Sequence, residues 1–190
     1  MSKTREQLEN WIEDIQVGDN DKVLDIGGSQ LPVNKRIRFS DTAVFKILDL
    51  EKPHHCVKEP DIICDLNKGY FEEGTDPNLL TGYDVAFCLE VTEYLYDPIV
   101  ALETIASMLK SEGVLYISFH FIYPVHNPKE FDYLRYTPIG AKKILEKTGF
   151  EVVEITPRLG EWNPMMDGMK PSRDYNSHDW VGCLIKAKKL

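Results

Sequence analysis

The sequence predicts an α/β fold: a doubly wound, mostly parallel seven-stranded sheet with a C-terminal antiparallel strand. Three observations support this prediction. Short apolar runs alternate with segments of helical periodicity, which is typical of parallel sheets covered by helices. The run at residues 22–26 leads directly into Gly27 and Gly28, where glycine permits a sharp turn close to a ligand. Near the C-terminus, a long loop followed by a last strand indicates an antiparallel addition to the sheet.

Length and composition narrow the classes of protein to consider. At 190 residues, the chain suits one domain with a single core, so we predict one domain over residues 1–190. The net charge of −9 argues against a broad nucleic-acid surface, which needs clustered Lys and Arg. No apolar run approaches the roughly 18 residues that span a bilayer. Residues 1–6 are polar and lack the apolar core of a signal peptide, so we predict a cytoplasmic protein without membrane contact.

Cysteine and histidine usage predicts neither disulfides nor a metal centre. The four cysteines are scattered and form no C-x-x-C pair, which is typical of reduced, buried thiols. Residues 54–56 (HHC) bring two histidines and a cysteine together, but no second cluster is spaced to complete a metal site.

Three segments have the periodicity of amphipathic helices. The first covers residues 4–16, where Thr4 and Gln7 match the pattern of a capping box. The clearest pattern lies at residues 98–110, which begin with a proline suited to a first helical turn. A third helix is predicted over residues 138–148, after a threonine that can cap it.

Seven apolar runs predict the strands of the sheet. They lie at residues 22–26, 43–48, 61–64, 83–89, 114–119, 150–155 and 180–187. The first four end in, or just before, an acidic residue, which gives the series Asp25, Asp49, Asp65 and Glu90. A strand-end Asp alone is often only a turn former, so the repetition on successive strands is what favours a ligand site.

The spacing of these acids suits a nucleoside ligand. Asp49 follows Asp25 by about 24 residues, and an acid near that offset commonly accepts hydrogen bonds from two ribose hydroxyls. Asp65 is followed by Leu66, a pair that suits the amino group of an adenine and one face of its ring.

Read together, these motifs resemble those of class I S-adenosylmethionine-dependent methyltransferases. The resemblance covers roughly residues 20–156. It is carried by residues 23–29 (VLDIGGS), 47–50 (ILDL), 63–66 (ICDL) and 83–91 (YDVAFCLEV), which match four family motifs in order. The resemblance implies an enzyme that binds S-adenosylmethionine as its cofactor.

The resemblance also divides the chain and assigns cofactor residues. It implies an N-terminal helix at 1–19, a cofactor-binding half at 20–119 and an acceptor-side half at 120–190. The glycine turn would pass under the methionine part, with the strand-end acids beside the amino group, ribose, adenine and sulfonium. The implied cofactor residues are Asp25, Gly27, Gly28, Ser29, Asp49, Leu50, Asp65, Leu66, Leu89 and Glu90.

Residues 123–126 (YPVH) and 132–138 (DYLRYTP) resemble a subgroup of small methyltransferases often associated with glycan or other specialised biosynthesis. His126 is our candidate for a base that takes a proton from an alcohol acceptor. The alternative is a loop histidine bonded to backbone. His120 continues an apolar strand, so we expect a packed role for it.

Arg135 and Tyr136 are the other acceptor-side candidates. Arg135 suits a carboxylate or phosphate on the acceptor, or else it pairs with Asp132 and holds the loop against the next helix. The loop at residues 157–179 either closes over the acceptor or covers the edge of the sheet, through the apolar side chains Trp162, Met165, Met166 and Met169.

Two positions depart from the family pattern. The usual G-x-G-x-G turn appears as residues 27–32 (GGSQLP), and the usual Glu-His pair after the fourth strand appears as Glu93 and Tyr94. These departures support an alternative hypothesis, a non-catalytic S-adenosylmethionine-binding or scaffold domain in an assembly.

The leading hypothesis is methyl transfer from S-adenosylmethionine to a hydroxyl or amine of a small molecule, such as a sugar or another biosynthetic intermediate. A nicotinamide-dependent oxidoreductase is disfavoured because the sequence lacks G-x-G-x-x-G. A nucleic-acid methyltransferase is disfavoured by the net charge of −9.

Overall fold

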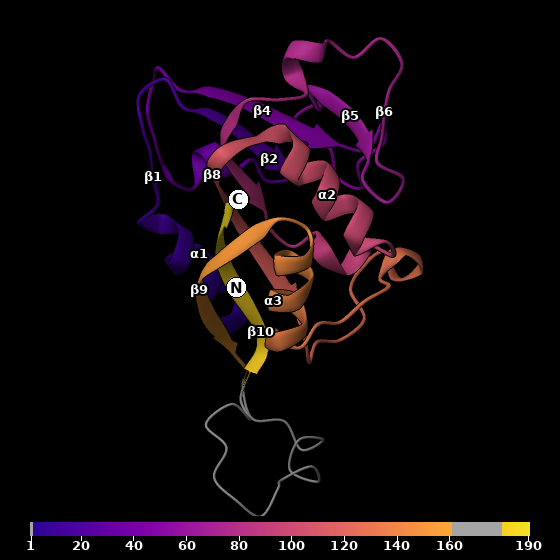
Figure 1. Ribbon diagram of the computed structural model, residues 1–190. Coiled ribbons are helices and arrows are strands. Elements are labelled where there is room, and N and C mark those ends of the chain that lie inside the picture. Colours follow the sequence, from indigo (N-terminus) through magenta and orange to yellow (C-terminus); the bar gives the residue numbers. More distant parts are fainter. Residues whose placement is uncertain (1, 161–179) are drawn as a thin grey trace, which may run out of the picture.

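A central sheet of eight strands forms the middle layer of the protein (Figure 1). The computed structural model describes residues 2–160 and 180–190. The strand order is β6 (Tyr70–Phe71), β5 (Ile62–Asp65), β4 (Val44–Asp49), β2 (Lys22–Ile26), β7 (Tyr83–Cys88), β8 (Leu109–His120), β10 (Trp180–Lys189) and β9 (Phe150–Leu159).

The strands from β5 to β8 run parallel, while β10 is antiparallel to both of its neighbours. The predicted mostly parallel sheet with an antiparallel C-terminal strand is therefore confirmed. The short edge strand β6, which pairs antiparallel with β5, adds to the seven predicted strands.

Helices cover both faces of the sheet (Figure 1). Helix α1 (Lys3–Glu13) packs on one face through Leu8 and Ile12, which contact Val23 and Leu184 in a smaller core cluster. Helices α2 (Pro98–Met108) and α3 (Pro138–Lys147) pack on the opposite face, over the larger core cluster. Successive side chains of a strand point to opposite faces, so strands such as β2, β7 and β10 contribute to both clusters.

The connections on the β2 side of the sheet carry little regular structure. Between β2 and β4 the chain forms one 3-10 turn, η1 (Val33–Lys35), and a two-residue strand β3 (Arg38–Phe39) that pairs with β1 (Gln16–Val17). Pro32 immediately precedes η1 and disfavours a helical start at the glycine turn. The remaining 3-10 turns are η2 (Pro77–Leu79), η3 (Thr92–Tyr94) and η4 (Lys129–Phe131).

Of the two predicted helix N-caps, the one of α3 is confirmed and the one of α1 is wrong. Thr137 caps α3 by accepting a hydrogen bond from Gly140 N at 3.0 Å. The predicted capping box of α1 is wrong: Ser2 is the N-cap, and the Gln7 side chain instead bonds the backbone N–H and C=O of Leu159. Strand β9 lies at the edge of the sheet, so its free backbone groups are available to Gln7.

The parallel register positions the candidate site. Asp25 of β2 pairs with Ile47 of β4 and with Phe87 of β7, so the residues that follow these strands meet at one edge of the sheet.

All four cysteines are free thiols, and Cys56 is the exposed one. Across the described residues, no helix combines the length and apolarity needed to cross a membrane. The loop predicted over residues 157–179 starts later than expected, because β9 extends to Leu159, and its apolar side chains Trp162, Met165, Met166 and Met169 lie outside the described residues.

Candidate active site

A cleft of about 1030 Å³ opens at the carboxyl ends of β2, β4, β5 and β7. Its lining combines residues from both predicted halves of the chain, including Gly27, Asp49 and Asp65 from one half and His126 from the other. Six of the predicted cofactor residues line this cleft: Gly27, Asp49, Leu50, Asp65, Leu66 and Glu90.

The glycine turn leaves the cleft open at its base. Gly27 has a φ of +71°, which glycine adopts without strain. A Cβ atom at Gly27 would lie 2.5 Å from Cγ2 of Val91, and one at Gly28 would lie 2.3 Å from Oδ2 of Asp25. The turn therefore admits no side chain at either position, and its backbone forms a cradle into which part of a ligand fits.

Four predicted cofactor residues lie behind the cleft rather than in it. Asp25 is 4% exposed, and its Oδ2 accepts a hydrogen bond from Val33 N at 2.7 Å. Burial raises the pKa of Asp25 to about 7, against the opposing effect of the Val33 bond. Gly28 and Ser29 are also buried, and Leu89 packs against the core cluster under α1. These residues order the turn from behind.

Asp49 lines the cleft with its carboxylate held by backbone. Oδ2 accepts from Ser29 N at 3.2 Å and Oδ1 accepts from Leu50 N at 2.8 Å. Each carboxylate oxygen has a second acceptor site, so the fixed group can still take two hydroxyls. Asp65 accepts from Asn67 N at 3.2 Å and pairs with exposed Lys68. Together with the glycine cradle, these acids fit the ribose and adenine parts of S-adenosylmethionine.

Glu90 begins a buried polar network at the other end of the cleft. Arg158, itself 1% exposed, donates from Nη1 to Glu90 Oε1 at 2.6 Å, and Ser118 Oγ donates to the same oxygen at 2.9 Å. Nε2 of His120 lies 3.4 Å from Glu90 Oε2. Burial opposes ionisation, but His120 and Arg158 together hold the pKa of Glu90 well below its usual range.

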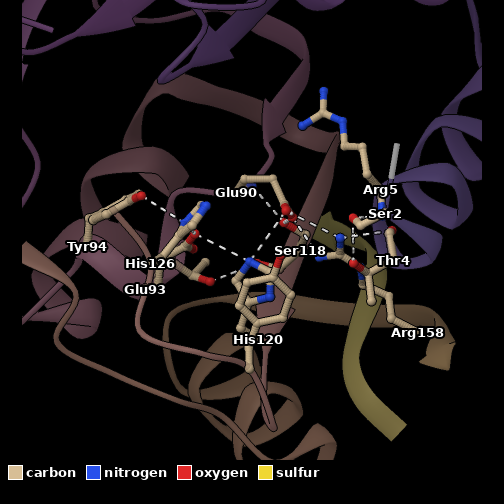
Figure 2. A network of polar contacts seen from close by, with 12 residues as sticks. Ser2, Thr4, Arg5, Glu90, Glu93, Tyr94, Ser118, His120, His126 and Arg158 are labelled. Carbon is tan, nitrogen blue, oxygen red and sulfur yellow. Dashed lines mark hydrogen bonds and ion pairs between the residues drawn. The ribbon is translucent and has the colours of Figure 1, made fainter. Parts of the chain in front are cut away.

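Glu93 is the centre of the network, which Figure 2 shows from Tyr94 to Arg158. The Glu93 side chain is fully buried, and its Oε1 lies 3.0 Å from His126 Nδ1 and 3.3 Å from His120 Nε2. The Tyr94 hydroxyl lies 2.8 Å from the same Nδ1 atom and donates to the Asn127 carbonyl. Despite burial, the two neighbouring histidines lower the pKa of Glu93.

The two histidines differ in environment. His120 is 2% exposed, and although burial opposes protonation, Glu90 and Glu93 raise its pKa to about 9. His126 lines the cleft and its side chain is 37% exposed. The packed role predicted for His120 agrees with its burial, but no sequence pattern indicated that its ring faces two carboxylates.

The structure separates the other acceptor-side candidates from the cleft. Arg135 donates from Nη1 and Nη2 to the two carboxylate oxygens of Asp132, at 2.5 and 2.6 Å. Oδ2 of Asp132 in turn accepts from His126 N at 2.5 Å. Tyr136 is buried, and its hydroxyl donates to Thr92 O at 3.2 Å. Of the two alternatives for Arg135, this geometry supports the one in which Arg135 holds the loop.

Sequence reasoning assigned no site role to Glu93 or Arg158. Glu93 lies three residues after Glu90, so both carboxylates follow one strand, and that spacing was a usable signal. Arg158 lies in β9, in a stretch with no local pattern that marks it as buried. Its partner is 68 positions away in the sequence, so only the fold brings the two together.

Comparisons with known proteins give the family of the chain. A family model described as a methyltransferase domain matches residues 5–155. No curated protein gives a match.

Solved structures share the fold at low sequence identity. An S-adenosylmethionine-dependent methyltransferase from Mesorhizobium loti is 11% identical with a TM-score of 0.61, and the match covers 99% of this chain and 98% of that one. A chain of the complex between the Haloferax volcanii Trm112 methyltransferase activator and the putative methyltransferase is 16% identical with a TM-score of 0.61, over 98% of this chain and 89% of that one.

The [4+2]-cyclase SpnF is also similar, with 15% identity and a TM-score of 0.59 over 96% of this chain and 80% of that one. The fold therefore accompanies more than one reaction. The family model decides the class, since it matches most of the chain. This protein belongs to the methyltransferase-domain family, and the predicted enzyme class, an S-adenosylmethionine-dependent methyltransferase, is confirmed at the level of that family.

Proposed function

We propose that this protein transfers a methyl group from S-adenosylmethionine to a hydroxyl or amine of a small molecule, and that the acceptor lies beside His126. One observation carries the proposal: a single cleft is lined both by strand-end acids and by this histidine. The sulfonium of bound S-adenosylmethionine supplies an already activated methyl group. The protein then has to align the acceptor and accept its proton.

His126 has the arrangement of a general base. A proton on Nδ1 can be donated to Glu93 Oε1, 3.0 Å away, which leaves the lone pair on Nε2. Among the described residues, none is hydrogen-bonded to that Nε2 atom. A carboxylate that fixes the tautomer of a histidine in this way stabilises the imidazolium formed when the ring takes a proton. The acceptor hydroxyl would give its proton to Nε2 as the new bond to the methyl carbon forms.

The resemblance of residues 123–138 to small methyltransferases of specialised biosynthesis supports an acceptor such as a sugar. Because Arg135 is already paired with Asp132, the acceptor does not need an acidic group to satisfy it.

Calorimetry with S-adenosylmethionine tests the cofactor end of the cleft. We expect the full chain to bind, and Asp49→Asn to weaken binding by on the order of 10–100-fold, the cost of losing hydrogen bonds to a charged group. The matched control is Asp84→Asn, because Asp84 is also a strand acid but bonds Lys22 N and Lys110, away from the cleft. Equal losses in the two variants would contradict the assignment.

Turnover tests the acceptor end. With S-adenosylmethionine carrying a labelled methyl group and a panel of sugars, alcohols and amines, we expect transfer that His126→Asn slows by about 10²–10⁴-fold without weakening cofactor binding. Full activity in His126→Asn would refute the base. Binding without transfer to any acceptor would favour the alternative, a non-catalytic domain.

A further inference from the structure

Three metal-ligating side chains converge at the acceptor end of the cleft. They are Glu93 from η3, His120 from the end of β8 and His126 from the following loop. One ligand atom of each lies within 4.8 Å of the others. No sequence spacing marks this set, because the residues come from three separate segments, which Figure 2 shows pointing toward one another.

The distances match those between neighbouring ligands of one ion. Ligands that bind zinc at about 2.0–2.1 Å in tetrahedral geometry lie about 3.3–3.4 Å apart, and octahedral neighbours lie about 3 Å apart. Glu93 Oε1 lies 3.3 Å from His120 Nε2 and 3.0 Å from His126 Nδ1. Glu93 Oε1 is therefore placed as a neighbouring ligand to both imidazoles, whose own ligand atoms lie within 4.8 Å of each other.

Two buried atoms in the set lack a hydrogen-bond partner among the described residues. Oε2 of Glu93 and Nε2 of His120 are both inaccessible to solvent, in side chains that are 0% and 2% exposed. His120 Nε2 lies 3.3–3.4 Å from two carboxylates but has hydrogen-bond geometry to neither. Buried polar atoms are nearly always bonded, so an unpartnered atom on each of two side chains of the set indicates that a ligand is missing from this cluster.

We propose that Glu93, His120 and His126 bind a divalent first-row transition-metal ion. Two imidazoles and one carboxylate suit Zn²⁺, Mn²⁺ or Co²⁺ better than Mg²⁺, which prefers oxygen ligands. Three protein ligands leave a position open, and His126 places that position at the cleft. The ion replaces the protons on His120 Nε2 and His126 Nδ1, which pass to solvent.

The surrounding structure holds the ligands in place. Backbone N–H groups of Tyr133 and Leu134 donate to the Glu93 carbonyl at 2.8 and 3.2 Å. The His126 backbone is fixed by Asp132, which Arg135 holds. Residues that orient ligands in this way are a usual part of a metal site. The metal proposal does not rest on methyl transfer: with Nδ1 bound to metal, His126 Nε2 keeps its proton, so the base role above belongs to the metal-free protein.

Metal titration of the chelator-treated full chain, without S-adenosylmethionine, tests this proposal. We expect calorimetry with ZnCl₂ and MnCl₂ to show one ion bound per chain, MgCl₂ to bind far more weakly, and CoCl₂ to give the visible absorption of a nitrogen- and oxygen-ligated ion. His126→Asn should weaken Zn²⁺ binding by at least the roughly 10–100-fold that loss of an orienting residue costs. His55→Asn is the matched control, because His55 is exposed and lines the same cleft.

Three results would overturn the proposal: no Zn²⁺, Mn²⁺ or Co²⁺ binding to the wild-type chain, unchanged binding in His126→Asn, or an equal loss in His55→Asn. Crystals of the wild-type chain soaked in ZnCl₂ give a test that needs no variant to fold. An anomalous peak between the three ligand atoms is the expected result, and a peak only at exposed histidines contradicts it. Because the cofactor is left out of both measurements, failure here is distinct from failure of methyl transfer.

Discussion

The two ends of the cleft are built from different kinds of contact. At the cofactor end, acids accept hydrogen bonds from backbone: Asp25 from Val33 and Asp49 from Leu50. At the acceptor end, acids bond side chains from distant segments, as Glu90 does with Arg158. The first kind of site depends on the path of one turn, whereas the second depends on several side chains arriving at one point.

The pKa values of the acids at the two ends shift in opposite directions. Asp25 is buried without a cation in contact, and burial raises its pKa to about 7. Glu90 and Glu93 are buried beside His120, and there the cationic partners outweigh burial and lower both pKa values. The fold therefore tolerates a neutral acid where backbone holds it, but needs a positive charge where two carboxylates meet.

Removing the cation at the acceptor end should have the largest effect. Arg158→Met leaves Glu90 in a buried site without its guanidinium partner, so we expect the free energy of unfolding to fall by about 3–5 kcal/mol, measured by urea denaturation. The double variant with Glu90→Gln should recover part of that loss, because the unpaired charge is gone. A loss below about 1 kcal/mol would show that solvent or His120 already compensates Glu90.

An exposed ion pair provides the control for that measurement. Lys143 and Glu146 pair on the surface of α3, with side chains 72% and 36% exposed. Lys143→Ala should leave the free energy of unfolding nearly unchanged, since exposed pairs are screened by water.

The titration of Asp25 tests the cofactor end. Its pKa is about 7 in the folded chain, against roughly 3.9 in an unfolded one. Between these values the folded state holds the extra proton, so the contribution of Asp25 to stability falls as pH rises from about 4 to 7 and is constant above. Asp25→Asn keeps an acceptor for Val33 N, so it should remove this fall and be more stable than wild type at pH 8, by on the order of a few kcal/mol.

Asp84→Asn should change the pH dependence of stability in the opposite direction from Asp25→Asn. Burial opposes ionisation of Asp84, but Lys110 lowers its pKa, so the contribution of Asp84 to stability is present above the unfolded pKa and lost as pH falls below about 4.

The prediction for Asp25 has its own contradicting outcome. Parallel stability curves for wild type and Asp25→Asn from pH 4 to 8 would mean that Asp25 stays ionised in the fold.

The cofactor end was predictable from sequence because its signals are local. A strand, an acid near its end and a glycine turn follow one another within residues 22–29, and a strand that ends in an acid returns at Asp49 and Asp65. Parallel pairing then places these strand ends at one edge without further information. The sequence pattern did not distinguish residues that line the cleft from residues that hold the turn behind it. Asp25 and the cleft-lining Asp49 both lie at strand ends, yet Asp25 is 4% exposed.

The acceptor end was not predictable in the same way. His126 was identified by residue type, but its partners Glu93 and His120 are set by the packing of η3 against β8. Arg135 illustrates a second limit of prediction from sequence. Its residue type suits an anionic ligand, and its three-residue spacing from Asp132 suits a local pair, so the sequence favoured both roles equally. The helix cap at Ser2 was missed because an edge strand, rather than the helix, takes the Gln7 side chain.

The smallest expected effect, that of Tyr94→Phe, tests whether the two ends of the cleft act independently. Tyr94→Phe removes a hydroxyl that contacts His126 Nδ1 at 2.8 Å and donates to the Asn127 carbonyl at 2.7 Å. We expect a loss of about 1 kcal/mol in thermal unfolding, the net value of such bonds, and unchanged calorimetric affinity for S-adenosylmethionine. Tyr96→Phe, at an exposed tyrosine nearby, should change neither quantity. If Tyr94→Phe instead weakened cofactor binding while leaving stability intact, the two ends would be coupled, and the acceptor-side network would have to be treated as part of the cofactor site.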